Sequence, residues 1–428
     1  MEKSIKSTRR IKLIVSMVVI LFAGIITAWT ILMAPYIQTE LPEGEGAIVN
    51  FAQLGIVFTV TMICFCLGNV CSGLISNQTT ASLRFVLSGL LLFSSFYISS
   101  LSIVTLPLSN NYFLLNCSYG LLGGLGAGMA YNTIISTMNM WYPDKRGFCS
   151  GLLIASFGLS LLLIGRIADM MGRSEGIGWQ STYVYIGVVL GIIMLVAAIV
   201  IRPPKKDLEA YFNKSKSKSR LIKKAKDFTA EEMIKTQAFW LVFAFIAIIA
   251  AIGNATIGFA SRIAFDLGAT ESFAVFIVGI LGVSNGIGRL LSGWLFDCVG
   301  IKRTQLLSSV IAVLAPLMVA LAFVGGSLLL GVIGLCLCGL SFGFAPTSCS
   351  YFASGFYGQK DFNLNFSIFG LILIPASFIT TLAGSLRAST GSFEIVFFIL
   401  TGLAAVAFAL NLLIKQPKKV EKSDEDIK

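Results

Sequence analysis

The sequence contains no histidine and carries little charge. Only 12% of its 428 residues are charged, whereas 56% are hydrophobic. Histidine is the commonest metal ligand, the usual general base and the usual proton switch near neutral pH, so its absence removes most of the material for an enzyme. A soluble protein of this length needs far more surface charge. The composition therefore indicates an all-α polytopic membrane protein, and we expect neither catalysis nor a cofactor.

The cysteines do not form a metal-binding pattern. Nearly all nine fall inside apolar runs. The two closest pairs, Cys64 with Cys66 and Cys336 with Cys338, are separated by one residue, which is not the spacing of a metal clip. We interpret the cysteines as small packing residues and expect no metal.

Twelve apolar runs are long enough to cross a bilayer. The first follows a basic N-terminus and continues to about Tyr36; it is too long for a signal peptide and lacks an A-x-A-like cleavage site. The other spans are expected at 51–76, 83–106, 112–140, 147–170, 181–202, 237–264, 272–296, 304–325, 327–355, 364–386 and 392–414.

Lysine and arginine gather on one side of these spans. With both termini cytoplasmic, the cytoplasmic segments hold all 32 basic residues except Arg166, Arg173, Arg262, Arg289 and Arg387. The first external loop is acidic, with Glu40, Glu43 and Glu45. This pattern follows the positive-inside rule and accounts for the formal net charge of +11 without a nucleic-acid partner. We expect a multi-pass protein of the inner or plasma membrane.

The longest polar segment divides the spans into six and six. We expect an N-terminal six-helix bundle at 1–202, a cytoplasmic basic linker at 203–236, a C-terminal six-helix bundle at 237–414 and a cytoplasmic tail at 415–428. Within the linker, Thr229-Ala230-Glu231-Glu232 fits a capping box, which predicts a short helix before the seventh span.

The two halves share an internal repeat. Residues 68–77 and 288–297 both read Gly-x-x-x-Ser-Gly-x-x-x-(Asn/Asp), 220 positions apart, and Gly124 and Gly128 recur as Gly339 and Gly343, 215 positions apart. Two matches in the same order at nearly one offset indicate pseudo-symmetric halves. Paired halves with a site at their interface are the architecture of alternating-access transporters, for which a monomer suffices.

One full positive charge lies deep inside the eighth span. Arg289 precedes Asp297, the nearest residue certain to reach the aqueous edge, by eight positions. It therefore lies about 12 Å inside a hydrocarbon core of about 30 Å. Arginine at that depth is costly and by default marks a ligand or ion site. The alternative is a structural role, in which Arg289 pairs with a backbone carbonyl or clamps the two halves together.

Three stretches carry a family resemblance. The first span reads Ala23-Gly24-Ile25-Ile26-Thr27-Ala28-Trp29, and the fourth continues into Trp141-Tyr142-Pro143-Asp144-Lys145-Arg146-Gly147. The eighth reads Asn285-Gly286-Ile287-Gly288-Arg289, followed by Gly293, Asp297, Gly300, Lys302 and Arg303. Over nearly the whole chain the sequence resembles the major facilitator superfamily, and within it the oxalate:formate antiporter family. The resemblance implies a twelve-helix carrier of organic anions.

The sequence departs from that family in two places. Asn77 stands where the first-half copy of the loop motif usually has aspartate, and only Arg84 remains of its basic residues. The oxalate transporters carry a lysine in span eleven that partners the span-eight arginine, whereas residues 370–375 here contain no basic residue. A dianion would leave one charge poorly matched by a single arginine. We therefore expect a monoanion, or a larger amphipathic acid.

A guanidinium can hold both oxygens of a carboxylate and stays protonated, so Arg289 is the principal candidate for substrate binding. Uncharged donors from facing helices would complete the site; the candidates are Trp29, Asn69, Tyr131, Asn132, Asn254 and Tyr351. Each aromatic residue could instead be a packing or interface residue. Asn69 occupies the repeat position of Arg289.

The loop residues are expected to gate access from the cytoplasm. The candidates are Gly293, Asp297, Gly300, Lys302 and Arg303 of the loop motif, together with Asp144, Lys145 and Arg146. Arg166 and Asp169 stand three positions apart and are expected to pair.

These features predict a secondary active transporter that moves a small organic anion across the membrane by alternating access. The spans contain no carboxylate at mid-depth, so a proton relay is hard to build, and anion exchange or a substrate-borne proton fits better. Two alternatives stay open. One is an exporter of amphipathic drugs in which Arg289 is structural, and the other is a non-transporting membrane sensor on the same fold.

Overall fold

Helices make up all the regular structure of the described chain. The computed structural model describes residues 2–37, 51–109, 112–204 and 227–417. Twelve helical segments in these ranges are long and apolar enough to cross a membrane, which confirms the predicted twelve spans. The acidic first loop, most of the basic linker and the end of the tail lie outside the described residues. The predicted domain boundaries remain predictions.

The chain forms two compact units. Unit 1 consists of Met1–Lys218 with Gly286–Asp297, and unit 2 of Ser219–Asn285 with Cys298–Lys428. The helix α13 (Glu271–Val299) is therefore divided between them. Its stretch 286–297, which carries Arg289, belongs to unit 1.

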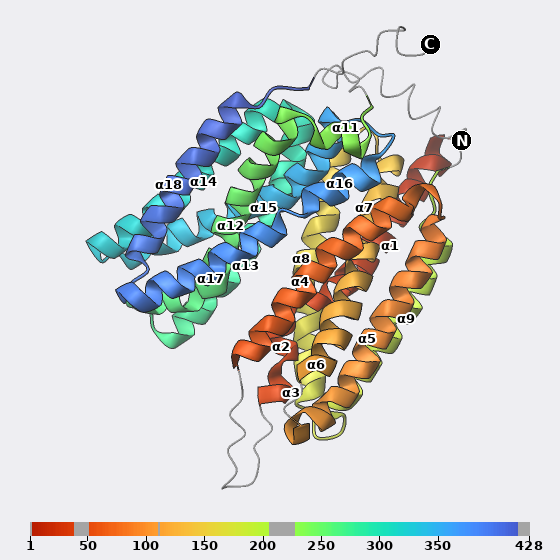
Figure 1. The fold of residues 1–428 in the computed structure, drawn as a ribbon, viewed down its shortest axis with the longest axis horizontal. Coiled ribbons are helices and arrows are strands. Elements are labelled where there is room, and N and C mark those ends of the chain that lie inside the picture. Colours follow the sequence, from red (N-terminus) through yellow and green to blue (C-terminus); the bar gives the residue numbers. More distant parts are fainter. Residues whose placement is uncertain (1, 38–50, 110–111, 205–226, 418–428) are drawn as a thin grey trace. The chain divides into compact units, whose positions relative to one another are not determined.

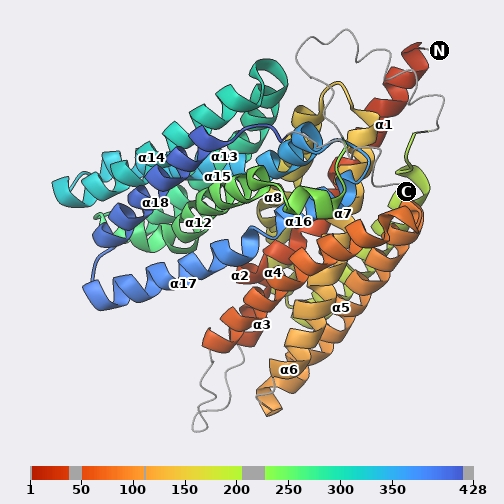
Figure 2. The ribbon, with the colours of Figure 1, turned by 45° about the horizontal axis from the view of Figure 1, so that its top comes forward.

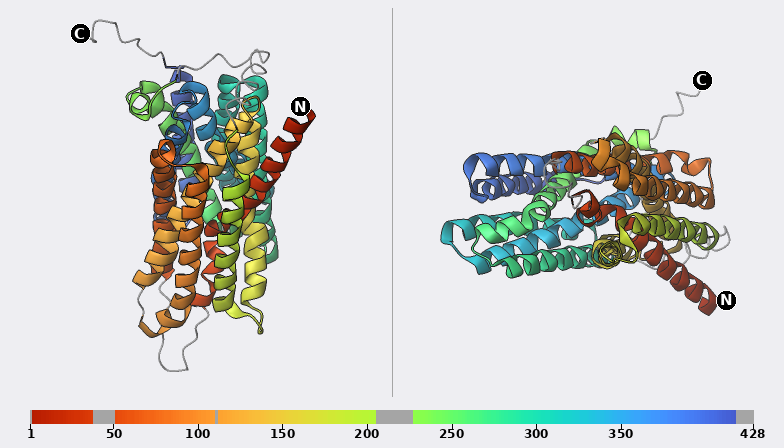
Figure 3. Two further views of the ribbon diagram at one scale, coloured as in Figure 1. Left: turned by 90° about the vertical axis from the view of Figure 1, so that its right-hand side faces the viewer. Right: turned by 90° about the horizontal axis from the view of Figure 1, so that it is seen from below.

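Six long helices build unit 1: α1 (Glu2–Ala23), α4 (Phe51–Leu74), α5 (Ala81–Ser109), α7 (Gly124–Trp141), α8 (Arg146–Gly172) and α9 (Gly178–Val200). The helices α5 and α9 pack along each other, as do α4 and α7 (Figure 1). Glycines allow the second contact, because a Cβ at Gly128 would lie 2.0 Å from the carbonyl oxygen of Phe65. Short segments complete the unit: η2 (Ile75–Asn77), α6 (Tyr112–Leu115) and the π-helical η3 (Asn116–Gly123). In both views of Figure 3, α1 begins away from the other helices of unit 1.

The first span is broken, although the sequence predicted a single helix to about Tyr36. After α1 come the 3₁₀ turn η1 (Gly24–Thr27), α2 (Trp29–Leu32) and α3 (Ala34–Ile37). Backbone groups freed by such a break need partners inside a membrane. Tyrosine hydroxyls supply them: Tyr119 donates to the carbonyl of Ile26 at 2.9 Å, and Tyr183 to that of Leu32 at 2.5 Å.

Unit 2 holds α11 (Ala230–Ile234), α12 (Gln237–Asp266), the remainder of α13, α14 (Ile301–Gly325), α15 (Leu328–Phe356), α16 (Phe362–Gly370), α17 (Leu373–Thr390) and α18 (Glu394–Leu413). The helix α14 packs against α15 and α18 (Figure 2). The eleventh span breaks between α16 and α17, because Pro375 has no N–H to donate to the carbonyl of Leu371. The predicted capping box is confirmed at Thr229 and Glu232, at the start of α11.

Candidate functional site

Arg289 lies against the backbone of α8. Its Nη1 donates a hydrogen bond of 2.6 Å to the carbonyl oxygen of Ile154, and its side chain is partly exposed. This is the backbone contact that the sequence left open as a structural alternative. A guanidinium carries five N–H donors, and a carbonyl carries no net charge. The contact therefore orients the guanidinium and engages one of its donors.

A row of glycines brings α8 and the 286–297 stretch together. Gly147, Gly151 and Gly158 lie on one face of α8 at about 100° per residue. A Cβ at Gly151 would lie 2.5 Å from the backbone oxygen of Arg289, and one at Gly147 would lie 2.4 Å from that of Gly293. A Cβ at Gly158 would lie 2.3 Å from Nη1 of Arg289. Gly147 and Gly151 therefore allow close approach of the 286–297 backbone, and Gly158 allows close approach of the Arg289 guanidinium.

Asp297 binds the start of α8. Its carboxylate accepts hydrogen bonds from the backbone N–H groups of Gly147, at 3.1 Å, and Phe148, at 2.8 Å. Lys145, the N-cap residue of α8, makes no side-chain cap. The first N–H groups of a helix need acceptors, and a negative charge there is favourable. Asp297 therefore caps α8 from a distant part of the chain.

The other predicted gating residues are divided between the two units: Asp144 and Arg146 belong to unit 1, and Gly300, Lys302 and Arg303 to unit 2. Asp144 pairs with Arg9 of α1, whose guanidinium also lies over the ring of Tyr142 at 4.2 Å. Lys302 and Arg303 are exposed and belong to unit 2. Gly300, at the end of α13, has a φ of 82°, which favours glycine. Arg146 is the first residue of α8. The gating role of these residues remains a prediction.

An aromatic triad lies beside the glycine row. The rings of Phe65, Tyr131 and Phe157 have centroids 5.2 to 5.7 Å apart. Tyr131 is buried, and Phe157 precedes Gly158, whose Cβ would lie 2.3 Å from Nη1 of Arg289. The structure thus brings two of the predicted site residues, Arg289 and Tyr131, into one region. Sequence reasoning missed Phe65 and Phe157, since aromatic residues in apolar runs carry no distinguishing pattern.

Asn69 and Asn132 are also brought together, but with each other. Asn132 Nδ2 donates to Asn69 Oδ1 at 2.8 Å, and Ser72 Oγ lies 3.0 Å from Thr133 Oγ1 beside them. Asn69 is 2% exposed and Asn132 is fully buried. The pair joins α4 to α7.

The remaining site candidates lie elsewhere in the fold. Trp29 is buried at the break in the first span, with its ring centroid 4.5 Å from that of Tyr119. Asn254 is partly exposed and Tyr351 is buried, and both belong to unit 2.

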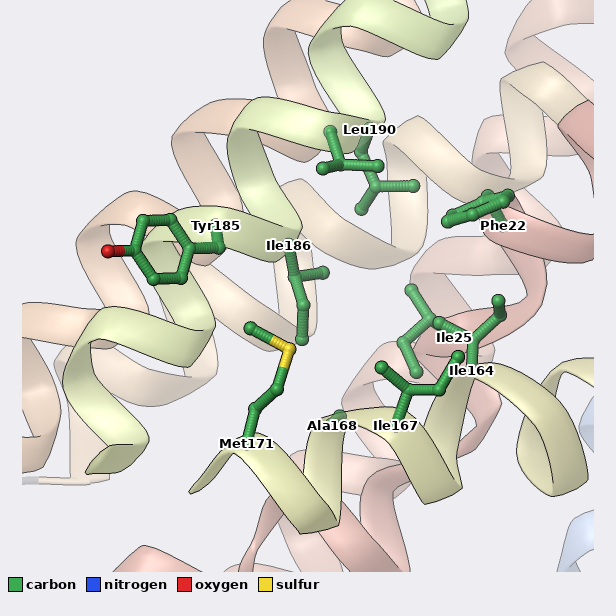
Figure 4. A pocket seen from close by; sticks show the side chains of 10 residues that line it. Phe22, Ile25, Ile164, Ile167, Ala168, Met171, Tyr185, Ile186 and Leu190 are labelled. Atoms are coloured by element: carbon green, nitrogen blue, oxygen red, sulfur yellow. The ribbon is translucent and has the colours of Figure 1, made fainter. Parts of the chain in front are cut away.

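A separate groove of about 260 Å³ lies between α1, α8 and α9 (Figure 4). Its lining includes Phe22, Ile164, Met171 and Leu190, and it contains no charged side chain. The hydroxyl of Tyr185 points away from the other lining residues in Figure 4. The groove has nothing to match the charge of an anion, so it is not the predicted site.

One predicted ion pair is wrong. Asp169 pairs with Arg173 rather than with Arg166, at 2.6 Å from Nε. Both spacings allow a pair, but the acid precedes the base in Asp169–Arg173, which is the more favourable order on a helix. Arg166 is exposed on α8.

Comparisons with known proteins agree with the fold. The family model described as Major Facilitator Superfamily matches residues 13–373 and 244–427. The oxalate:formate antiporter of Oxalobacter formigenes is 25% identical over 297 residues, which cover 68% of each chain. Human monocarboxylate transporter 10 is 24% identical, over 94% of this chain and 77% of its own. The solved structure of the proton:xylose symporter XylE superimposes with a TM-score of 0.75 at 14% identity, covering 96% of this chain and 97% of its own.

Proposed function

Because the chain belongs to the major facilitator superfamily, we propose that it carries a small organic anion, a monocarboxylate, across the membrane by alternating access. Two relatives support this substrate class by what they are called, an oxalate:formate antiporter and a monocarboxylate transporter. Their identity to this chain is low, so the proposal depends on the site.

The observation that carries the proposal is the environment of Arg289. A charged side chain at the centre of a span costs about 2.5–3.5 kcal/mol on insertion scales. The bond to the Ile154 carbonyl fixes the orientation of the guanidinium. A carboxylate bound there would bring a negative charge to the guanidinium and accept parallel hydrogen bonds from its planar fork.

A single arginine at mid-depth favours a substrate with one carboxylate over a substrate with two. In the described spans no second cation lies at mid-depth, because every other lysine or arginine there, such as Arg84, Arg166 and Arg262, stands closer to a span end than Arg289 does. A dianion would bring one charge into low dielectric without a partner. The spans also lack a mid-depth carboxylate for a proton relay, so we propose anion exchange or a proton carried by the substrate.

The test is uptake of labelled acetate and butyrate into proteoliposomes. Arg289→Gln keeps side-chain amide donors but removes the charge, and should cost about 2 kcal/mol or more, roughly thirty-fold in uptake efficiency. Arg166→Gln is the matched control, because Arg166 is exposed on α8 and outside the proposed site. It should transport like the unmodified protein.

Competition separates this function from its alternatives. Unlabelled monocarboxylates should compete more strongly than oxalate or succinate. Substrate-driven flux that no carboxylate inhibits would instead support an exporter of amphipathic drugs, and binding without flux would support a sensor. Normal carboxylate uptake by Arg289→Gln in the membrane would contradict the proposal.

A further inference from the structure

The guanidinium of Arg289 occupies a seat on α8 formed by the carbonyl of Ile154 and the bare backbone of Gly158. We propose that Gly158 is a positioning residue, which holds the guanidinium in one orientation and so determines which carboxylates the protein accepts. The proposal rests on the proposed function of Arg289 and adds a selectivity determinant to it.

Helix geometry explains why the seat needs glycine. Gly158 stands four positions after Ile154, so the two residues are joined by one helical hydrogen bond. A helical side chain leans over the turn that precedes its own Cα. Any side chain at position 158 would therefore cover the Ile154 carbonyl, which Nη1 of Arg289 reaches at 2.6 Å.

The three atoms nearest to such a methyl group all belong to the guanidinium. A Cβ at position 158 would lie 2.3 Å from Nη1, 3.0 Å from Cζ and 3.4 Å from Nη2 of Arg289. These atoms form the far end of a flexible side chain, so the guanidinium can withdraw while the two backbones stay in place. Gly151 differs, because its Cβ would meet the backbone oxygen of Arg289 at 2.5 Å. Alanine at 158 therefore changes the position of the charge rather than the helix packing.

The size of the displacement follows from contact distances. Ordinary contacts between non-bonded heavy atoms lie near 3.5 Å, so Nη1 must move by about 1 Å. That is enough to break its bond to the Ile154 carbonyl. A misplacement of about 1 Å at a reacting group can cost up to a hundredfold, and a two-point contact to a carboxylate is similarly sensitive to orientation.

The seat also sets where the charge lies relative to aromatic groups. Phe157, next to Gly158, packs its ring against that of Tyr131, with the ring centroids 5.2 Å apart. A guanidinium that leaves the seat changes its distance from both rings. The space left for the apolar part of a monocarboxylate changes with it, so we expect the preference between short and longer acids to change.

The experiment compares Gly158→Ala with Gly191→Ala in proteoliposomes, with labelled acetate and butyrate as probes. Gly191 lies in the spanning helix α9, and a Cβ there would meet only the Cβ of Phe93, at 3.7 Å. Gly158→Ala should raise the KM for at least one probe about tenfold and change the acetate-to-butyrate ratio, whereas Gly191→Ala should change neither. A loss of Vmax that is equal for both acids, with KM and the ratio unchanged, would mean that Gly158 is only a packing residue.

A double variant tests whether the effect passes through Arg289. Lysine lacks the planar fork of arginine. In a protein that already carries Arg289→Lys, Gly158→Ala should therefore change KM by less than a third of the change that it causes in the unmodified protein. Equal effects in the two backgrounds would overturn the proposal. If Gly158→Ala alone fails to reach the membrane, adding Arg289→Gln should restore its membrane level by removing the displaced group; failure to restore it also overturns the proposal.

The two proposals fail in different ways. If Arg289→Gln abolishes uptake and Gly158→Ala leaves KM and selectivity unchanged, the seat is wrong and carboxylate transport stands. If Arg289→Gln transports normally, the function itself is wrong, whatever Gly158→Ala does.

Discussion

The charge of Arg289 could be recognised from the sequence, whereas its contact with the Ile154 carbonyl could not. Its charge inside an apolar run marks it without any structure. Its contact with the Ile154 carbonyl depends on a backbone group, and every residue has the same one. Gly158 could be predicted in part. Its spacing from Gly147 and Gly151 places it on the same face of the helix, but nothing in that spacing indicates that the side chain of Arg289, and not a backbone segment, packs against it.

Tyr119 stabilises the broken first span through its hydroxyl group. Its hydroxyl, fully buried, satisfies the Ile26 carbonyl at the break in the first span. Tyr119→Phe should lower the free energy of unfolding by about 1 kcal/mol, because it leaves that carbonyl without this donor. The measurement is denaturant unfolding of the detergent-purified protein.

Tyr185→Phe is the matched control for that hydroxyl. Tyr185 is 51% exposed on α9, so removing its hydroxyl should leave the stability unchanged. Equal stability of the Tyr119 and Tyr185 variants would show that the carbonyl at the break finds another partner.

At the scale of elements, the carboxylates that bind the backbone at the start of corresponding helices come from different parts of the chain in the two units. The repeat relates α8 of unit 1 to α16 of unit 2, and Asp297 caps α8. The repeat position of Asp297 is Asn77, which has no charge. In unit 2 a carboxylate comes instead from the end of the linker: Asp227 accepts from the backbone N–H groups of Gln359, at 2.8 Å, and Lys360, at 3.2 Å.

Neighbouring contacts hold the linker end to the same turn. The N–H of Phe228 donates to the carbonyl of Tyr357 at 2.9 Å, and the Tyr357 hydroxyl lies 3.0 Å from that of Thr236. Burial raises the pKa of Tyr357 to about 12, so its phenol stays protonated at physiological pH. Gly358 has a φ of 81°, and a Cβ there would lie 2.2 Å from Asp227 Oδ1. Any other residue would be strained and would also displace the carboxylate.

Asp227→Ala should loosen the turn before α16. Without the carboxylate, hydrogen exchange at the amides of Gln359 and Lys360 should become roughly fivefold faster, because local opening is less costly. Hydrogen exchange read by mass spectrometry on peptides that cover 356–362 measures the effect. Asp361→Ala is the control, since Asp361 is the N-cap residue of α16 but makes no side-chain cap. Unchanged exchange in the Asp227 variant would show that the contacts of Phe228 and Tyr357 suffice.

At the scale of the whole molecule, charge distribution predicts orientation. Apart from Arg173 and Arg387, the basic residues outside the predicted spans lie in segments that face one side when both termini are cytoplasmic. Green fluorescent protein fused after Lys428 should therefore fluoresce, because it folds in the cytoplasm. Alkaline phosphatase fused at the same position should be inactive, because it requires the exterior. Active phosphatase would mean that the predicted topology is inverted.

The sequence alone determined the twelve spans and the capping box of α11, and it predicts the pseudo-repeat and the depth of Arg289. Each depends on local pattern: apolar length, charge position, or spacing within one helix. The break in the first span, the Asn69–Asn132 pair and the seat on α8 were decided only by tertiary structure. Most of these depend on atoms that are distant in sequence, and several depend on backbone carbonyls. Such groups become distinguishable only when packing decides which of them remain within reach of a donor.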